Sequence, residues 1–131
     1  MGNEDISNFQ RKIPISVPKI RTVLRRACRK LRSKIPGLSV AFVGERRMRR
    51  LNKEYIGHDH MTDVITFGYG EIVICPAVAS RNAKRYGNTL EDEITLCVVH
   101  GILHLCGYDD RSPQDVKRMR RKETEILGKI L

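Results

Sequence analysis

Apolar residues recur in the first third of the chain with the spacing of one helix face, and arginines occupy the opposite face. The repeat is formed by Ile20, Val23, Leu24, Ala27, Cys28 and Leu31. Pro18 suits the first turn of such a helix, and Pro36-Gly37 marks its limit. The pattern predicts an amphipathic helix that packs on one side and is basic on the other.

Shorter apolar runs predict the strands of a small sheet. Residues 7–15 are less regular and suit an edge strand, whereas residues 38–43 are typical of a buried strand. β-Branched and aromatic residues fill the runs 64–67 and 71–75, and Gly68-Tyr69-Gly70 separates them. These two runs predict a pair of strands joined by a turn.

Further helices alternate with these strands. They are predicted over residues 45–55, over residues 76–86, from Thr89 toward Gly107, and from the cap Ser112 onward. The inward side of the last helix is marked by Val116, Met119, Glu123, Ile126 and Ile130. Glu123 is the one residue of that set that departs from the apolar pattern. Strands alternating with helices predict an α+β fold, and 131 residues predict a single domain over 1–131.

Composition is that of a globular protein, with 40% hydrophobic and 31% charged residues. No apolar run approaches the ~20 residues of a membrane span, and the first residues are polar and acidic, so we expect a cytoplasmic protein. The four cysteines form no C-x-x-C pair and have apolar neighbours. This favours buried thiols over a disulfide framework, with Cys97 as a core residue.

Positive charge is concentrated near the N-terminus. Residues 11–50 hold fourteen Lys or Arg and one acid, a net charge of +13 within a total of +10. This density favours a polyanionic partner such as RNA, although a solvated basic surface is the alternative. The candidate RNA-binding residues are Arg25, Arg29, Arg32, Arg46 and Arg49.

His100 and His104 are the candidate metal ligands. Residues four apart share a helix face, so both rings can reach one ion. Gly107 suits a left-handed helix end that turns the chain back, which offers Asp109 or Asp110 as a third ligand. Alternatively the rings are core histidines with protein partners, but the apolar run before His100 indicates a buried helix in which they need partners.

Two other features bear on the chemistry. In H-E-x-x-H metalloproteases the residue after the first histidine is a catalytic glutamate, whereas here it is Gly101, which argues against a peptidase. The overall spacing still resembles the metzincin arrangement. His58-Asp59-His60 follows Gly57 in an expected loop and offers either a second metal site or contacts to substrate.

A resemblance to a known family rests on several motifs. They are His-Gly-x-Leu-His-Leu-x-Gly-Tyr-Asp over 100–109, Thr-Asp-Val-Ile-Thr-Phe over 62–67, Gly-Glu-Ile-Val-Ile over 70–74, and the acidic Glu93. From about Val40 to the last helix, the chain resembles the YbeY family of bacterial metal-dependent endoribonucleases. The resemblance implies a mixed sheet of about four strands covered by about five helices, with a metal site at the C-terminal end of a central helix. It also implies one divalent metal ion, with Zn²⁺ the first expectation, and a role in rRNA processing on ribosomal particles.

The chain departs from that family at two positions. The family's three metal-binding histidines fall on His100, His104 and Asp110, and an arginine suited to bind phosphate is replaced by Ile56. A carboxylate ligand makes the site more negative, so the bound water becomes less acidic and the metal preference shifts toward harder ions such as Mn²⁺.

Three hypotheses follow. The first is a metal-dependent endoribonuclease in which a metal-bound water attacks a phosphodiester. The second is an rRNA-associated binding factor with a weakened or structural metal site. The third is a metallohydrolase of another substrate. The sequence alone does not identify a general base, the RNA substrate or the oligomeric state.

Overall fold

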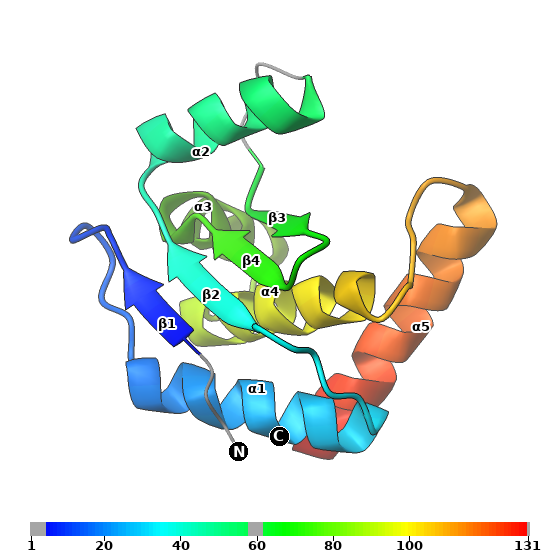
Figure 1. The fold of residues 1–131 in the computed structure, drawn as a ribbon. Coiled ribbons are helices and arrows are strands. Elements are labelled where there is room, and N and C mark those ends of the chain that lie inside the picture. The colour runs from blue at the N-terminus through cyan, green and yellow to red at the C-terminus, as the bar shows by residue number, and fades with distance from the viewer. Residues whose placement is uncertain (1–4, 58–61, 131) are drawn as a thin grey trace.

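The structure is a computed structural model that describes residues 5–57 and 62–130, the last two by their backbone alone. Within these residues the chain forms four strands, five α-helices and one short π-helix (Figure 1). The strands are β1 (Asp5–Asn8), β2 (Ser39–Phe42), β3 (Val64–Phe67) and β4 (Glu71–Ile74). The helices are α1 (Val17–Leu31), α2 (Glu45–Leu51), the π-helix η1 (Asn52–Ile56), α3 (Pro76–Tyr86), α4 (Leu90–Leu105) and α5 (Pro113–Ile130).

The four described strands form one mixed sheet in the order β1-β2-β4-β3. β1 and β4 both run parallel to the central strand β2, whereas β3 and β4 form an antiparallel pair. The turn that joins β3 to β4 contains Gly70, whose φ of 114° is available to glycine at little cost. The expected α+β fold with a mixed four-stranded sheet is therefore confirmed.

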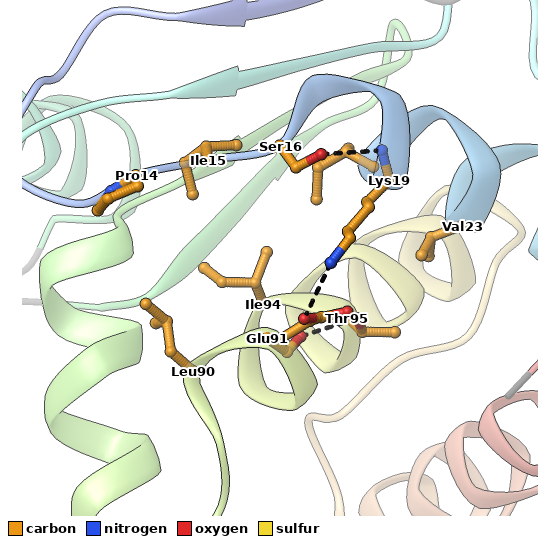
Figure 2. A pocket seen from close by; sticks show the side chains of 10 residues that line it. Pro14, Ile15, Ser16, Lys19, Val23, Leu90, Glu91, Ile94 and Thr95 are labelled. Atoms are coloured by element: carbon orange, nitrogen blue, oxygen red, sulfur yellow. Dashed lines mark hydrogen bonds and ion pairs between the residues drawn. The ribbon is translucent and has the colours of Figure 1, made fainter.

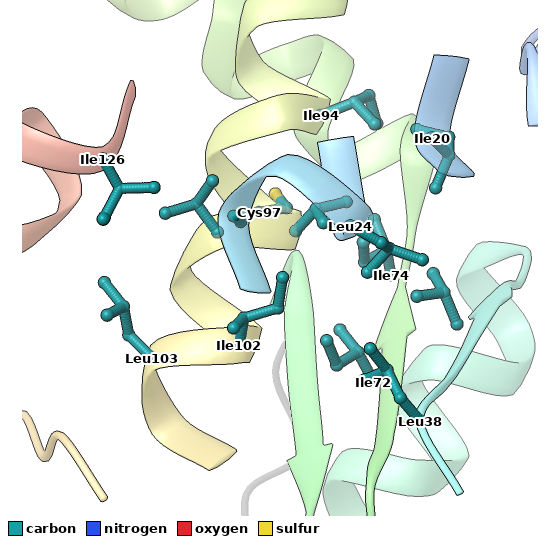
Figure 3. Close-up of a cluster of buried hydrophobic side chains, with 14 of the residues drawn as sticks. Ile20, Leu24, Leu38, Ile72, Ile74, Ile94, Cys97, Ile102, Leu103 and Ile126 are labelled. Atoms are coloured by element: carbon teal, nitrogen blue, oxygen red, sulfur yellow. The ribbon is translucent and has the colours of Figure 1, made fainter. Parts of the chain in front are cut away.

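Helices cover the two faces of the sheet unequally. On one face, α1, α4 and α5 enclose the main core, in which Leu24, Ile72 and Ile102 are fully buried (Figures 1 and 3). On the other face a smaller cluster forms where Met48 of α2 packs against β2, β3 and β4. Alternation of side chains along each strand supplies both clusters, because neighbouring residues point to opposite faces. The central helix α4 is therefore held firmly against the sheet.

Local signals explain most helix boundaries. The hydroxyl oxygens of Ser16, Thr89 and Ser112 accept hydrogen bonds from backbone amides three residues later, at 3.4, 3.0 and 3.1 Å. Some boundaries differ from expectation. The first strand is Asp5–Asn8 and not residues 7–15, and α1 ends at Leu31, where Arg32 adopts a left-handed conformation.

The helix expected over residues 45–55 is α-helical only to Leu51. It continues as the π-helix η1, in which the amide of Gly57 donates to the carbonyl of Asn52 at 2.9 Å. Gly57 then ends the helix with a φ of 83°. The wider turn changes which directions residues 52–56 face, and π-turns often occur at functional sites.

Two further expectations concern the cysteines and membrane-spanning segments. All four cysteines are free thiols, and Cys97 is buried in the main core as predicted, whereas Cys28 and Cys106 are only partly buried. Among the described residues, the longest helices are too short or too polar to cross a bilayer.

Candidate metal centre

Helix α4 presents His100 and His104 side by side near its C-terminal end. Their ring centroids are 4.6 Å apart with an angle of 76° between the ring planes, and their Nε2 atoms are 3.0 Å apart. Each side chain is about one fifth exposed, at 23% and 22%. The i, i+4 spacing therefore places two imidazole nitrogens at the same point on the surface, as the sequence predicts.

The chain reverses at Gly107 and returns Asp110 to this point. Gly107 has a φ of 99°, which a residue with a side chain adopts only with strain. Asp110 Oδ2 then lies 3.3 Å from His104 Nε2 and 3.7 Å from His100 Nε2. Asp109 is engaged elsewhere, because its Oδ1 accepts from the Asp110 amide at 2.8 Å and its Oδ2 pairs with Arg111. Of the two aspartates left open by the sequence, Asp110 is the one beside the imidazoles.

The three donor atoms fit one small cation. Their separations of 3.0, 3.3 and 3.7 Å bracket the value of about 3.3 Å expected between ligands of a tetrahedral zinc ion with bonds near 2.0–2.1 Å. Two imidazoles and one carboxylate also form a donor set common in catalytic zinc sites, which keep a fourth position open. The residues present therefore suit a divalent metal ion.

Glu123 of α5 contacts the candidate ligand His100 on the side away from His104 Nε2. His100 Nδ1 makes a short hydrogen bond to Glu123 Oε2, and the Glu123 side chain is only 12% exposed. If Nδ1 donates the proton, the lone pair of Nε2 points toward His104 and Asp110, which is the tautomer a metal requires. Burial lowers the pKa of His100, but the hydrogen bond to Glu123 and the nearby carboxylates raise it more, so the net pKa is raised.

The candidate ligands line a hollow of about 430 Å³ between α4, η1 and β3. Its walls include Asn52 and Ile56 of η1, together with Asp63 and Thr66. Asn52 is 1% exposed, and its Nδ2 has no hydrogen-bond acceptor among the described residues. Such an unpaired buried donor is costly, and it is often explained by a ligand or water in the site.

Asp63 is fixed at the edge of this hollow. Its Oδ2 accepts from Asn82 Nδ2 at 3.2 Å and from the Cys97 thiol at 3.6 Å. Its negative charge contributes to the raised pKa of His100. Cys97 is therefore not among the candidate metal ligands, but its thiol contacts Asp63 at the edge of the hollow.

Sequence reasoning assigned no site role to Glu123, Asn52 or Asp63. A signal existed for Glu123, the acid at an otherwise apolar position of its helix, and for Asp63, which lies within a family-like motif. Asn52 also lies within a family-like segment, residues 51–56. The predicted alternatives for His58, Asp59 and His60 lie outside the described residues.

Gly101 has a structural role that agrees with the argument against a peptidase. A Cβ atom at this position would lie 2.7 Å from Cγ2 of Ile72 in β4. Position 101 therefore faces the sheet, and a glutamate there would have no space.

The candidate RNA-binding arginines lie on two different surfaces. All five are exposed, but Arg25, Arg29 and Arg32 belong to α1 or its end, whereas Arg46 and Arg49 belong to α2. These helices cover opposite faces of the sheet (Figure 1). Only α2 continues directly into the wall of the metal hollow through η1.

A second hollow, of about 500 Å³, lies between the starts of α1 and α4 (Figure 2). Its walls are mostly apolar, with Ile15, Val23 and Ile94 among them. Lys19 and Glu91 form an exposed ion pair of 3.4 Å at its rim. The residues that line this hollow include no histidine or cysteine, so the candidate metal ligands line the other hollow, at His100.

The chain is similar to proteins of one known family. Residues 5–131 match the family model described as Endoribonuclease YbeY. Proteins named Endoribonuclease YbeY from Chlorobium phaeovibrioides and Pelotomaculum thermopropionicum are 39% and 33% identical, over 79% and 95% of this chain and 78% and 95% of theirs. A solution structure of a Thermotoga maritima protein superposes with a TM-score of 0.62 at 30% identity, over 97% of this chain and 88% of that one. The chain belongs to the YbeY endoribonuclease family.

Proposed function

We propose that this protein is a metal-dependent endoribonuclease that acts in rRNA processing and ribosome maturation, with residues 1–131 forming one hydrolase-like domain. His100, His104 and Asp110 are the proposed metal ligands, and Zn²⁺ is the proposed ion. The observation that carries the proposal is the convergence of these donor atoms within 4.8 Å of one another in a chain of the YbeY family.

The ion, when bound, polarises a phosphoryl oxygen and lowers the pKa of a coordinated water toward neutrality, which suits hydrolysis of a phosphodiester. The side chains of the protein hold the ion and orient the groups around it. Glu123 keeps the proton of His100 on Nδ1, so that Nε2 stays available. Asn52 lies in the wall of the hollow, and its buried Nδ2 is a donor with no acceptor among the described residues.

Asp110 and Ile56 favour a second candidate function. The carboxylate of Asp110 adds a negative charge to the ligand set, which weakens the ion as an electrophile. Ile56 lines the hollow where an arginine would bind phosphate bidentately, and its side chain is 49% exposed. Both features suit an rRNA-associated binding factor in which the metal site is structural or weakened.

Metal analysis comes first in testing the proposal. Wild-type protein should hold one equivalent of Zn²⁺ or Mn²⁺, and the His100→Ala and His104→Ala variants should lose it. Cys106→Ala is a matched control on the same helix end, because its thiol bonds to Ser33 and not to the site.

Cleavage then separates the two candidates. The loaded wild-type protein should cut structured rRNA, and activity should disappear with a chelator and return with added metal. If the loaded wild type leaves rRNA intact while an Asp110→His, Ile56→Arg double variant cuts it, the binding-factor function replaces the enzymatic one.

A further inference from the structure

Exposed aromatic side chains gather at one place on the molecule. The chain has only seven Phe and Tyr residues, and four of them line a single groove: Phe9, Tyr55, Phe67 and Tyr69. Phe9, Tyr55 and Tyr69 are 61%, 62% and 71% exposed. Exposing large aromatic surfaces without a partner is unfavourable, so such a cluster indicates a binding surface.

The groove has a volume of about 250 Å³ and lies on the face of the sheet that α2 covers only in part. Its floor is made of small or β-branched residues, among them Ala41 of β2, Val43 just after β2, and Val73 of β4. Its wall is built by Arg47, Leu51 and Tyr55, which follow one another at intervals of four residues through α2 and η1. It is therefore an open trough with an aromatic rim.

The rings are held in defined orientations. Phe67 and Tyr69 are stacked with centroids 5.7 Å apart, and Tyr55 meets Phe67 edge-on at 5.2 Å. The Tyr69 hydroxyl donates to Glu71 Oε1 at 2.7 Å, which fixes the outermost ring. Flat rings that are already ordered lose little conformational freedom when another ring stacks on them.

The charges around the groove identify the occupant. Arg47 lies 5.1 Å from the Phe9 ring, and α2 and η1 together carry five basic residues against Glu45 and Glu54. Glu45 is already paired with Arg81 at 2.6 Å, and Glu71 is occupied by Tyr69. Aromatic faces beside guanidinium groups match unpaired bases on a phosphate backbone, whereas they match an acidic or purely apolar peptide less well.

The groove adjoins the metal hollow across one strand. Thr66 of β3 lines the hollow, whereas its neighbour Phe67 lines the groove. In η1, likewise, Ile56 lines the hollow and its neighbour Tyr55 lines the groove. A nucleic acid chain that leaves the groove across β3 therefore reaches the metal hollow directly, because residues that are neighbours in sequence line the two.

We propose that the groove lined by Phe9, Tyr55, Phe67 and Tyr69 is a base-stacking site for single-stranded RNA, and that it holds the unpaired segment next to the position of cleavage. The choice of RNA as ligand rests on the proposed function, but the groove and its stacking rings are separate from the metal ligands. Binding by the groove requires neither metal nor cleavage.

The test measures binding without catalysis. Metal-stripped protein in a chelator is titrated with a fluorescein-labelled single-stranded oligoribonucleotide of uridine and adenosine, and with the same sequence as a duplex. Wild type should bind the single strand more tightly than the duplex and should show quenching of tyrosine fluorescence, which is readable because the chain has no tryptophan.

The variants Tyr55→Leu and Tyr69→Leu keep apolar bulk but remove the stacking ring. Each should weaken single-strand binding about tenfold, with little effect on duplex binding. Tyr86→Leu is the matched control, since Tyr86 is equally exposed at 67% but ends α3 outside the groove. Because Tyr55 and Tyr69 each contact Phe67, their variants should lower the melting temperature only slightly, and circular dichroism should confirm that all three variants are folded at the temperature of the binding assay.

The outcomes separate this inference from the proposed function. Wild type that binds the single strand through the groove but never cleaves it would refute the nuclease and leave the groove intact. Wild type that cleaves RNA while both groove variants bind as tightly as the control would refute the groove alone. Equal affinity for single strand and duplex, or no RNA binding by wild type, would also overturn the stacking site.

Discussion

Glu123 contacts the candidate ligand His100 without being a candidate ligand itself. A carboxylate that accepts a hydrogen bond from a metal-binding imidazole typically raises metal affinity 10–100-fold. We therefore expect Glu123→Gln to weaken Zn²⁺ binding about tenfold, measured by competition with a chromophoric chelator. Glu125→Gln is the control, because Glu125 pairs with Lys122 on the surface of the same helix. Equal affinities in both variants would exclude the supporting role.

Cys97 should make stability depend on alkaline pH. Burial raises the pKa of this thiol well above its usual range, and the charges of Asp63 and Glu93 raise it further. Above about pH 8.5 the unfolded chain releases a proton that the folded chain retains, so stability falls as pH rises, by up to about 1.4 kcal/mol per pH unit. Urea unfolding at several alkaline pH values should show this slope. Cys97→Ala should reduce the slope even if it lowers stability overall.

Among whole elements, α4 depends on close approach to the sheet. Gly101→Ala would place a Cβ 2.7 Å from Ile72, so we expect the free energy of unfolding to fall by about 1–3 kcal/mol. Gly128→Ala in α5 has nothing within 4 Å and should instead stabilise by about 0.5–1 kcal/mol. Urea unfolding of both variants measures the difference. A neutral or stabilising Gly101→Ala would mean that α4 can shift away from β4.

The sequence predicts helix bounds best where a proline, a glycine or a capping residue marks the start or the end. Helix α3 has the predicted bounds because Pro76 starts it and Gly87 ends it, and α4 begins after Thr89 as expected. The π-helix η1 could not be predicted, since its hydrogen bonds replace those of an α-helix without a distinct residue pattern. The first strand was placed too late because its pairing with β2, and not its own alternation, defines it.

At the scale of the whole molecule, sequence distance explains which site residues were found. His100, His104 and the pair Asp109 and Asp110 lie in one short stretch, so helix periodicity and one glycine turn predicted that they lie close together, and the family resemblance selected Asp110. Glu123 of α5, Asp63 just before β3 and Asn52 of η1 are distant in sequence from this stretch, and they come near it only in the folded chain. Tertiary packing, which local patterns do not encode, therefore supplies the support around the ligands.

The division of the basic residues between two faces makes a further prediction. RNA that passes from the aromatic groove to the metal hollow would meet α2 and not α1, because α2 continues through η1 into both. Each arginine that contacts a phosphate of a single strand adds about 0.7 to the slope of log K against log salt. An Arg46→Gln, Arg49→Gln variant should therefore reduce the magnitude of that slope by about 1.4. An Arg25→Gln, Arg29→Gln variant removes the same charge from α1 and should leave the slope nearly unchanged. Equal losses in the two variants would show that the RNA wraps around both faces of the sheet, and no loss in either would remove these arginines from the binding surface.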